Sequence, residues 1–166
     1  MIQLRIPRQL CQHMREDLVR PHAFAAERVG FARTAFSTTP DGSLLLLKSY
    51  WPVPDDQYVD DAWVGARINS SAIRAAMQDV LSGGGAHGLF HVHLHARRGR
   101  TALSKTDAAE IPKLIMSFRS VGPKAPHGLL VLTPDHALAF ALMPGTDKLL
   151  QIGNISIVGY PTEVLT

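Results

Sequence analysis

Apolar side chains recur along the 166 residues of this chain with two periods, one typical of helices and one typical of strands. The helical period predicts three helices. Pro7 begins the first helix and Pro21 stops it, whereas Asn69 or Ser70 caps the second, which a run of three glycines ends. Ser104 caps the third. The apolar stripes of the three helices contain Leu10, Met14 and Leu18; Ile73, Ala76, Met77, Val80 and Leu81; and Ile111, Leu114, Ile115 and Phe118.

Strands are predicted where a short apolar run lies between turn residues. The polar turn 38–42 joins two of these runs as a hairpin. Residues 52–61 contain prolines and acidic side chains, and we expect an exposed loop there. One strand carries the histidines that follow the second helix. The other strands are expected over Gln3–Ile6, Val29–Ala35, Leu44–Tyr50, Gly128–Thr133, Ala137–Leu142 and Leu149–Val158.

This order of elements predicts a mixed α/β fold in which a strongly curved mixed sheet is flanked by about three helices. We expect a single domain over residues 1–166, because no internal repeat or long linker divides the chain and its hydrophobic content is 46%. No run of eighteen apolar residues is present, so a membrane span is not expected. The lone Cys11 cannot form an internal disulfide, and the N-terminus lacks the apolar core of a signal peptide. These features favour a reducing cytoplasm.

The candidate chemistry is concentrated in residues 91–107. His91, His93 and His95 occupy alternate positions, and alternate side chains of an extended segment point to the same face. His93 and His95 can therefore present two imidazoles to one ion. Catalytic zinc usually takes three protein ligands and keeps one position open, and Asp107 can supply the third ligand. Ser104 and Asp107 also form the start of the third helix.

A zinc hydrolase needs a base that takes a proton from water, usually a carboxylate that is not a metal ligand. The chain has only four glutamates, Glu16, Glu27, Glu110 and Glu163. Glu16 and Glu163 lie in polar surroundings, and Glu110 is placed to face solvent or Lys113. Glu27 lies where a helical pattern gives way to an apolar strand, so it is the candidate for the base.

The arrangement of Glu27, then His93-x-His95, then Ser104-x-x-Asp107 resembles the JAMM motif of JAB/MPN-type metalloproteases. The resemblance covers roughly residues 1 to 142, and the order of helices and strands agrees with it. Leu94 and Ala96 depart from the residues usual in the family. Eight residues separate the histidine pair from Ser104 if His95 is the second ligand, and ten separate them if the pair is His91 and His93. The first pairing needs less insertion, and the second stays open.

The resemblance implies a single JAB/MPN-like domain that holds one Zn²⁺ per chain through His93, His95 and Asp107. Glu27 would act as general base, and Ser104 would steady the tetrahedral oxyanion. The reaction implied is hydrolysis of a peptide or isopeptide bond at the C-terminus of a ubiquitin-like protein, either in deconjugation or in precursor processing. Small prokaryotic members of this family suggest an E1-like activating enzyme as a partner in the same pathway.

Other functions are weighed against this one. The net charge of +3 and the arginines of the loop 97–100 could meet an acidic protein surface or a nucleic acid, but no nucleic-acid-binding signature accompanies them. A cupin also carries His-x-His but expects a glutamate where Gly99 and Arg100 stand. A non-catalytic MPN-type scaffold or protein-binding module is the main alternative, although such proteins typically lose residues that this chain retains.

Overall fold

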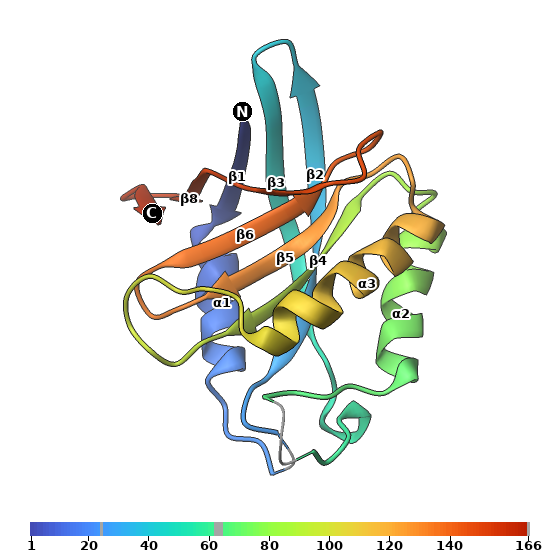
Figure 1. Cartoon of the computed structure of the whole chain (residues 1–166). Helices are drawn as coiled ribbons and strands as arrows, with labels where there is room; N and C mark the ends of the chain where they lie inside the picture. Colours follow the sequence, from blue (N-terminus) through green and yellow to red (C-terminus); the bar gives the residue numbers. More distant parts are fainter. Residues whose placement is uncertain (24, 62–64, 166) are drawn as a thin grey trace.

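The computed structural model describes residues 1–23, 25–61 and 65–165. Three α-helices, one short 3-10 helix and nine strands follow one another in these residues (Figure 1). In chain order they are β1 (Ile2–Pro7), α1 (Arg8–Leu18), β2 (Val29–Thr39), β3 (Gly42–Pro52), η1 (Asp55–Gln57), α2 (Ser70–Ser82), β4 (Gly88–Leu94), α3 (Lys105–Val121), β5 (His127–Leu132), β6 (Ala137–Leu142), β7 (Leu149–Gln151), β8 (Asn154–Val158) and β9 (Glu163–Leu165).

The nine described strands form one mixed sheet in the order β7-β6-β5-β4-β2-β3-β1-β8-β9. The pairs β1/β3, β1/β8 and β4/β5 are parallel, and the other neighbours are antiparallel. The sheet curls so far that β6 contacts β8, although five strands separate them in the sheet order. The prediction of a curved mixed sheet flanked by helices is therefore confirmed.

The helices cover opposite faces of the sheet. Cys11, Met14 and Leu18 of α1 belong to one core cluster, which also holds Phe90, Val92 and Leu94 of β4. Helices α2 and α3 pack on the other face through residues such as Ala76 and Phe118. Figure 1 shows α2 and α3 on the near side of the sheet and α1 behind it. Because side chains alternate along a strand, His91 and His93 of β4 point to the face that α2 and α3 cover.

One strand prediction is wrong. Leu149–Val158 was expected to be a single strand, but the structure divides it into β7 and β8, with Ile152 and Gly153 between them. β7 pairs with β6 and β8 pairs with β1, so the two strands lie near opposite ends of the sheet order. The curl of the sheet brings these ends together, so a single apolar run of the chain can form a strand at each of them. A short strand β9, which the sequence pattern did not predict, pairs with β8.

The hairpin and the helix starts agree with the pattern. β2 and β3 are longer than expected and pair up to the turn at Pro40 and Asp41. Asn69 caps α2, because its side chain accepts hydrogen bonds from two backbone N–H groups. The expected acidic loop contains η1, and residues 62–64 beside it lie outside the described residues. Among the described residues, none of the helices combines the length and apolar character that crossing a membrane requires.

Candidate metal centre

Strand β4 delivers its last histidines to the place where the sheet meets the start of α3. His93 pairs with Val29 of β2 on one side and with Val131 of β5 on the other, and its side chain is only 2% exposed. His95 follows the strand, and its backbone N–H donates a hydrogen bond to the carbonyl oxygen of Leu132 at 2.9 Å. Both imidazoles are therefore attached to a fixed backbone.

The Nε2 atoms of the two imidazole rings face each other. His93 Nε2 and His95 Nε2 are 3.3 Å apart, and His95 Nδ1 lies 2.7 Å from the hydroxyl of Thr101. The Thr101 hydroxyl donates to the carbonyl oxygen of Ala102, so its lone pair is available to accept the Nδ1 proton of His95. This tautomer leaves an unprotonated Nε2 on His95, directed at His93. A metal ligand requires that form of imidazole.

Asp107 approaches both histidines from the first turn of α3. Its Oδ1 is 3.7 Å from His93 Nε2, and its Oδ2 is 3.8 Å from His95 Nε2. The backbone N–H of Ser104 donates to Asp107 Oδ2 at 2.9 Å, and the backbone N–H of Asp107 donates to Ser104 Oγ at 3.0 Å. This capping box holds the carboxylate in place. Burial raises the pKa of Asp107, but His93 and the hydrogen bonds with Ser104 outweigh it, so the net pKa is lowered.

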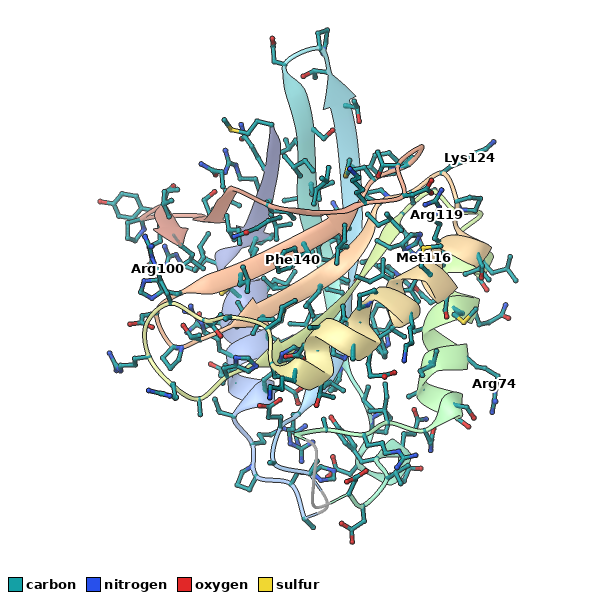
Figure 2. All side chains as sticks on the ribbon, viewed as in Figure 1. Arg74, Arg100, Met116, Arg119, Lys124 and Phe140 are labelled. Carbon is teal, nitrogen blue, oxygen red and sulfur yellow. The ribbon has the colours of Figure 1, made fainter. Side chains whose placement is uncertain are left out.

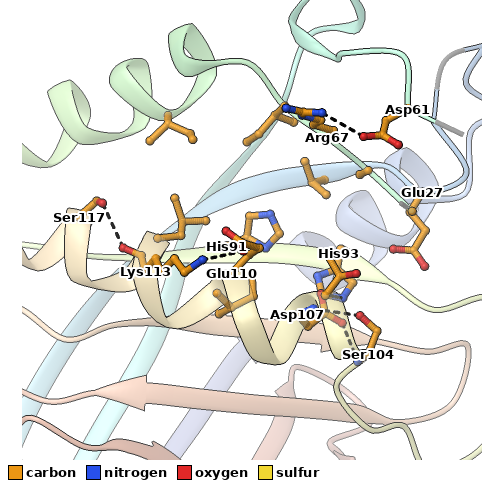
Figure 3. Close-up of a pocket in the computed structure, with 18 residues that line it drawn as sticks. Glu27, Asp61, Arg67, His91, His93, Ser104, Asp107, Glu110, Lys113 and Ser117 are labelled. Atoms are coloured by element: carbon orange, nitrogen blue, oxygen red, sulfur yellow. Dashed lines mark hydrogen bonds and ion pairs between the residues drawn. The ribbon is translucent and has the colours of Figure 1, made fainter. Parts of the chain in front are cut away.

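Glu27 reaches the same place from the segment before β2. Its backbone N–H donates to the carbonyl oxygen of Gly65 at 2.7 Å. One carboxylate oxygen of Glu27 and one nitrogen each of His93 and His95 all lie within 4.8 Å of one another. Figure 3 shows the Glu27 carboxylate and Ser104 on the same side of His93 in this view, with Glu27 above and Ser104 below. Burial raises the pKa of Glu27; His95 lowers it and Asp107 raises it, and the net shift is upward.

Glu27, His93 and His95 form a group that could hold a metal ion. Burial lowers the pKa of His93 to about 4, so its ring is neutral near pH 7, as a metal ligand must be. Within the described residues this group contains Glu27 where the sequence assigned Asp107 as the third ligand, and Asp107 lies beside it, 3.7 and 3.8 Å from the two imidazole nitrogens. Nitrogen and oxygen donors of this kind are the ligands that zinc takes in hydrolases. The residues present therefore fit a metal ion.

Geometry favours one of the two histidine pairs that the sequence left open. The convergent group in the described residues contains His93 and His95 and does not contain His91. The ring of His91 lies 5.6 Å from that of His93, on the side away from His95 along the strand. Burial lowers the pKa of His91 to about 3, so this ring is also neutral near pH 7. The arrangement favours the pairing of His93 with His95.

A groove of about 770 Å³ opens beside the centre (Figure 3). Its polar end is formed by Glu27, His93, Ser104 and Asp107. From there it follows α3 as far as Ser117, ten residues beyond Asp107, which corresponds to about 15 Å of helix at about 1.5 Å per residue. The opposite wall comes from residues 65–68 and from Ile73 of α2. A substrate can therefore approach the convergent side chains from solvent.

The Ser104 side chain caps α3 and also interacts with the Asp107 carboxylate. Its oxygen accepts a hydrogen bond from the Asp107 backbone at 3.0 Å, and a side-chain hydrogen bond from Ser104 is one cause of the lowered Asp107 pKa. Ser104 is exposed and lines the groove, so the hydroxyl faces the space where a substrate would lie.

Thr101 is the residue of the candidate centre that the sequence pattern missed. It lies in the loop between β4 and α3, where spacing gives no indication of which side chain turns back toward His95. A hydroxyl within a few residues of a ligand histidine is a signal, but several positions in this loop would satisfy it. The arginines of the same loop are exposed, and Figure 2 shows Arg100 at its outer side, pointing away from α3.

No protein-family model matches this chain, and no curated protein matches it. The function is therefore inferred from the side chains of the centre and from the groove beside it.

Proposed function

We propose that this protein is a zinc-dependent hydrolase of peptide or isopeptide bonds, with His93, His95 and Asp107 as metal ligands and Glu27 as general base. One observation carries the proposal. Glu27, 66 positions before His93 in the chain, has a carboxylate oxygen within 4.8 Å of the ligand nitrogens of His93 and His95. A carboxylate at this place is what removal of a proton from water beside the metal requires.

The two carboxylates differ in a way that supports separate roles. Asp107 is fixed by the Ser104 backbone and by its place in the first helical turn, which suits a ligand that must not move. The Glu27 side chain has no such hydrogen bond within the described residues, and its raised pKa brings it nearer to the range in which a base both takes and returns a proton.

Zinc bound at this centre would polarise the scissile carbonyl group and make a neighbouring water molecule more acidic. Glu27 takes the proton of that water and delivers it to the leaving amine. The Ser104 hydroxyl donates a hydrogen bond to the oxygen on which negative charge develops. Asp107 keeps its own charge throughout, because the backbone N–H of Ser104 donates to its carboxylate and favours the ionised form.

The substrate class is taken from the resemblance to JAB/MPN metalloproteases and not from geometry. By that resemblance the substrate is a ubiquitin-like protein or its conjugate, cut at the C-terminus of the ubiquitin-like part, and an E1-like activating enzyme acts in the same pathway. The setting is the cytoplasm. The groove supports this class to the extent that an extended chain of about four residues, at about 3.3 Å per residue, fits along about 15 Å of α3.

Glu27→Gln tests the proposal. The variant should bind one zinc per chain as the wild type does and should lose hydrolysis of a fusion to a ubiquitin-like protein by at least about a hundredfold, because general-base catalysis contributes about 10²–10⁴-fold. Zinc content is measured by metal analysis and turnover by gel assay. Glu16→Gln, an exposed change on α1, is the matched control and should keep full activity. Substantial turnover by Glu27→Gln would place the base elsewhere.

A non-catalytic scaffold is the second candidate. It is favoured if the folded wild-type protein binds no zinc or cuts no fusion while it still binds a ubiquitin-like protein. Retention of the complete set Glu27, His93, His95, Ser104 and Asp107 speaks against it, because a scaffold has no need of a base beside the histidine pair.

A further inference from the structure

His91 is a buried side chain that the hydrolysis chemistry does not use. It is 7% exposed, its Nδ1 is enclosed, and neither ring nitrogen has a hydrogen-bond partner within the described residues. Buried polar groups in proteins are normally hydrogen-bonded, so an imidazole with two unused nitrogens calls for an explanation.

His127, a buried histidine on the same side of the sheet and outside the candidate centre, shows what a purely structural role looks like. Its Nδ1 accepts a hydrogen bond from the Leu89 backbone at 3.2 Å, and its Nε2 donates to the Gly122 carbonyl oxygen at 2.8 Å. His91 is also buried but makes none of these bonds. A core role explains His127 and leaves His91 unexplained.

The surroundings of His91 lead out into the groove. Its ring lies against the edge of Phe31, at 5.8 Å between centroids, and beside His93, at 5.6 Å. His91 lines the groove, and its Nε2 is not among the enclosed atoms. Figure 3 shows His91 and His93 side by side above α3, with His91 farther along the groove than the centre.

The groove that His91 lines has mainly apolar walls, in which Val29 and Ile111 are buried and the other apolar side chains are half-buried. The walls are formed by side chains of β2, the segment before α2, α2 itself and α3, namely Val29, Ala66, Ile68, Ile73, Ile111 and Leu114. Charged residues occur at the rim, where Lys113 pairs with Glu110 and Arg67 pairs with Asp61. The interior of this part of the groove therefore offers apolar contacts and the imidazole of His91. The charged side chains that line the groove stand at its rim or in the metal centre.

We infer that this part of the groove is a side-chain subsite, which takes the residue beside the scissile bond when that residue has an apolar body and a hydroxyl tip that hydrogen-bonds to His91. The statement that the subsite takes the residue next to the scissile bond rests on the proposed function, because the metal centre fixes which bond is cut. A tyrosine-like side chain has the required form.

The chemistry of imidazole favours a hydroxyl tip. A neutral ring carries its proton on either nitrogen, so the accessible nitrogen is a donor in one tautomer and an acceptor in the other. A hydroxyl group donates or accepts as needed and can pair with both. A charged tip would be buried without a counter-ion, and a glycine would leave the apolar walls and the ring unfilled.

Binding of small amides tests the subsite without any hydrolysis. N-acetyl-tyrosinamide, N-acetyl-phenylalaninamide and N-acetylglycinamide are titrated into the zinc-loaded Glu27→Gln protein, and dissociation constants are read from chemical-shift changes. We expect the tyrosine probe to bind about tenfold more tightly than the phenylalanine probe, because one buried hydrogen bond is gained, and the glycine probe to bind more weakly than both.

His91→Leu should abolish the preference for tyrosine over phenylalanine while zinc content and the thermal midpoint stay close to those of the parent. His91→Gln, which keeps a hydrogen-bonding group, should restore part of the preference and covers the case in which His91→Leu does not fold. Equal binding of the two aromatic probes by the parent protein, or an unchanged preference in both His91 variants, overturns the subsite.

Failure of the subsite and failure of the proposed function give different results. If the wild type cuts no fusion protein but the probes show the expected preference, the hydrolase proposal fails and the subsite stands as a binding site. If fusions are cut and the probes bind without discrimination, hydrolysis stands and the subsite is wrong.

Discussion

Asp107 combines two tasks in one carboxylate. It caps α3 through Ser104 and faces the Nε2 atoms of His93 and His95 at 3.7 and 3.8 Å. The capping bonds keep its position independent of any bound ion, so the centre is largely formed in advance. The Glu27 carboxylate has no comparable hydrogen bonds in the described part of the chain. Its position therefore depends on the residues packed around it.

Gly65 is the residue that leaves room for the Glu27 carboxylate. A Cβ at Gly65 would lie 2.7 Å from Glu27 Oε2, closer than contact allows. Gly65→Ala should displace the base and lower hydrolysis by at least about tenfold, with little loss of stability because only the end of a flexible side chain must move. Turnover and the thermal midpoint are measured together.

Gly153→Ala is the matched control for this substitution, because a Cβ there has no atom within 4 Å. It should leave hydrolysis unchanged. If Gly65→Ala kept wild-type turnover, the placement of the Glu27 carboxylate would not matter for catalysis.

Thr101 orients a ligand through a single hydrogen bond. Thr101→Val keeps the shape of the side chain but removes the partner of His95 Nδ1, which lies 2.7 Å away. Partners of ligand histidines typically contribute about 10–100-fold to metal affinity, and we expect zinc affinity to fall within that range. Competition with a chelator measures the change. Thr101→Ser should restore the affinity, and equal affinities for wild type and Thr101→Val would contradict the role.

At the scale of elements, His127 joins the start of β5 to β4 and to the end of α3. Its folded-state pKa is lowered by burial from an ordinary value of 6.5, although the Gly122 carbonyl opposes the shift. The unfolded chain therefore binds a proton more readily, so this contribution to stability is complete above about pH 6.5 and is lost as the pH falls toward the folded pKa.

His127→Asn should flatten that dependence. Asparagine keeps an acceptor for the Leu89 N–H but does not titrate, so the slope of unfolding free energy between pH 6.5 and 5 should decrease by at most about 1.4 kcal/mol per pH unit. Urea unfolding of the metal-free protein at several pH values gives the slope. His13→Asn, an exposed change on α1, should not alter it. An unchanged slope in His127→Asn would show that this ring does not control acid stability.

At the scale of elements, the sequence predicted mainly the features that depend on residues close together in the chain. The cap at Ser104 and the alternation of the histidines depend on residues a few positions apart, and both were found. The division of Leu149–Val158 into β7 and β8 depends on how far the whole sheet curls. Periodicity within ten residues contains no information about that curl.

At the scale of the whole molecule, the candidate centre is an outcome of topology. β2 lies directly beside β4, and Val29 pairs with His93, so Glu27, two residues before Val29, comes to the end of the histidine strand. The sequence offered Glu27 by elimination among four glutamates, but pairing of β2 with β4 is what brings it there. Thr101 was not predicted, because its contact depends on the path of an irregular loop.

The most direct test of the account is the position of the ion itself. Anomalous scattering at the zinc edge from crystals of the zinc-loaded protein should give one strong peak, about 2.0–2.2 Å from the ligand atoms of His93, His95 and Asp107, with the Glu27 carboxylate outside the ligand set. A peak between His91 and His93, or the absence of any peak near these residues, would contradict it.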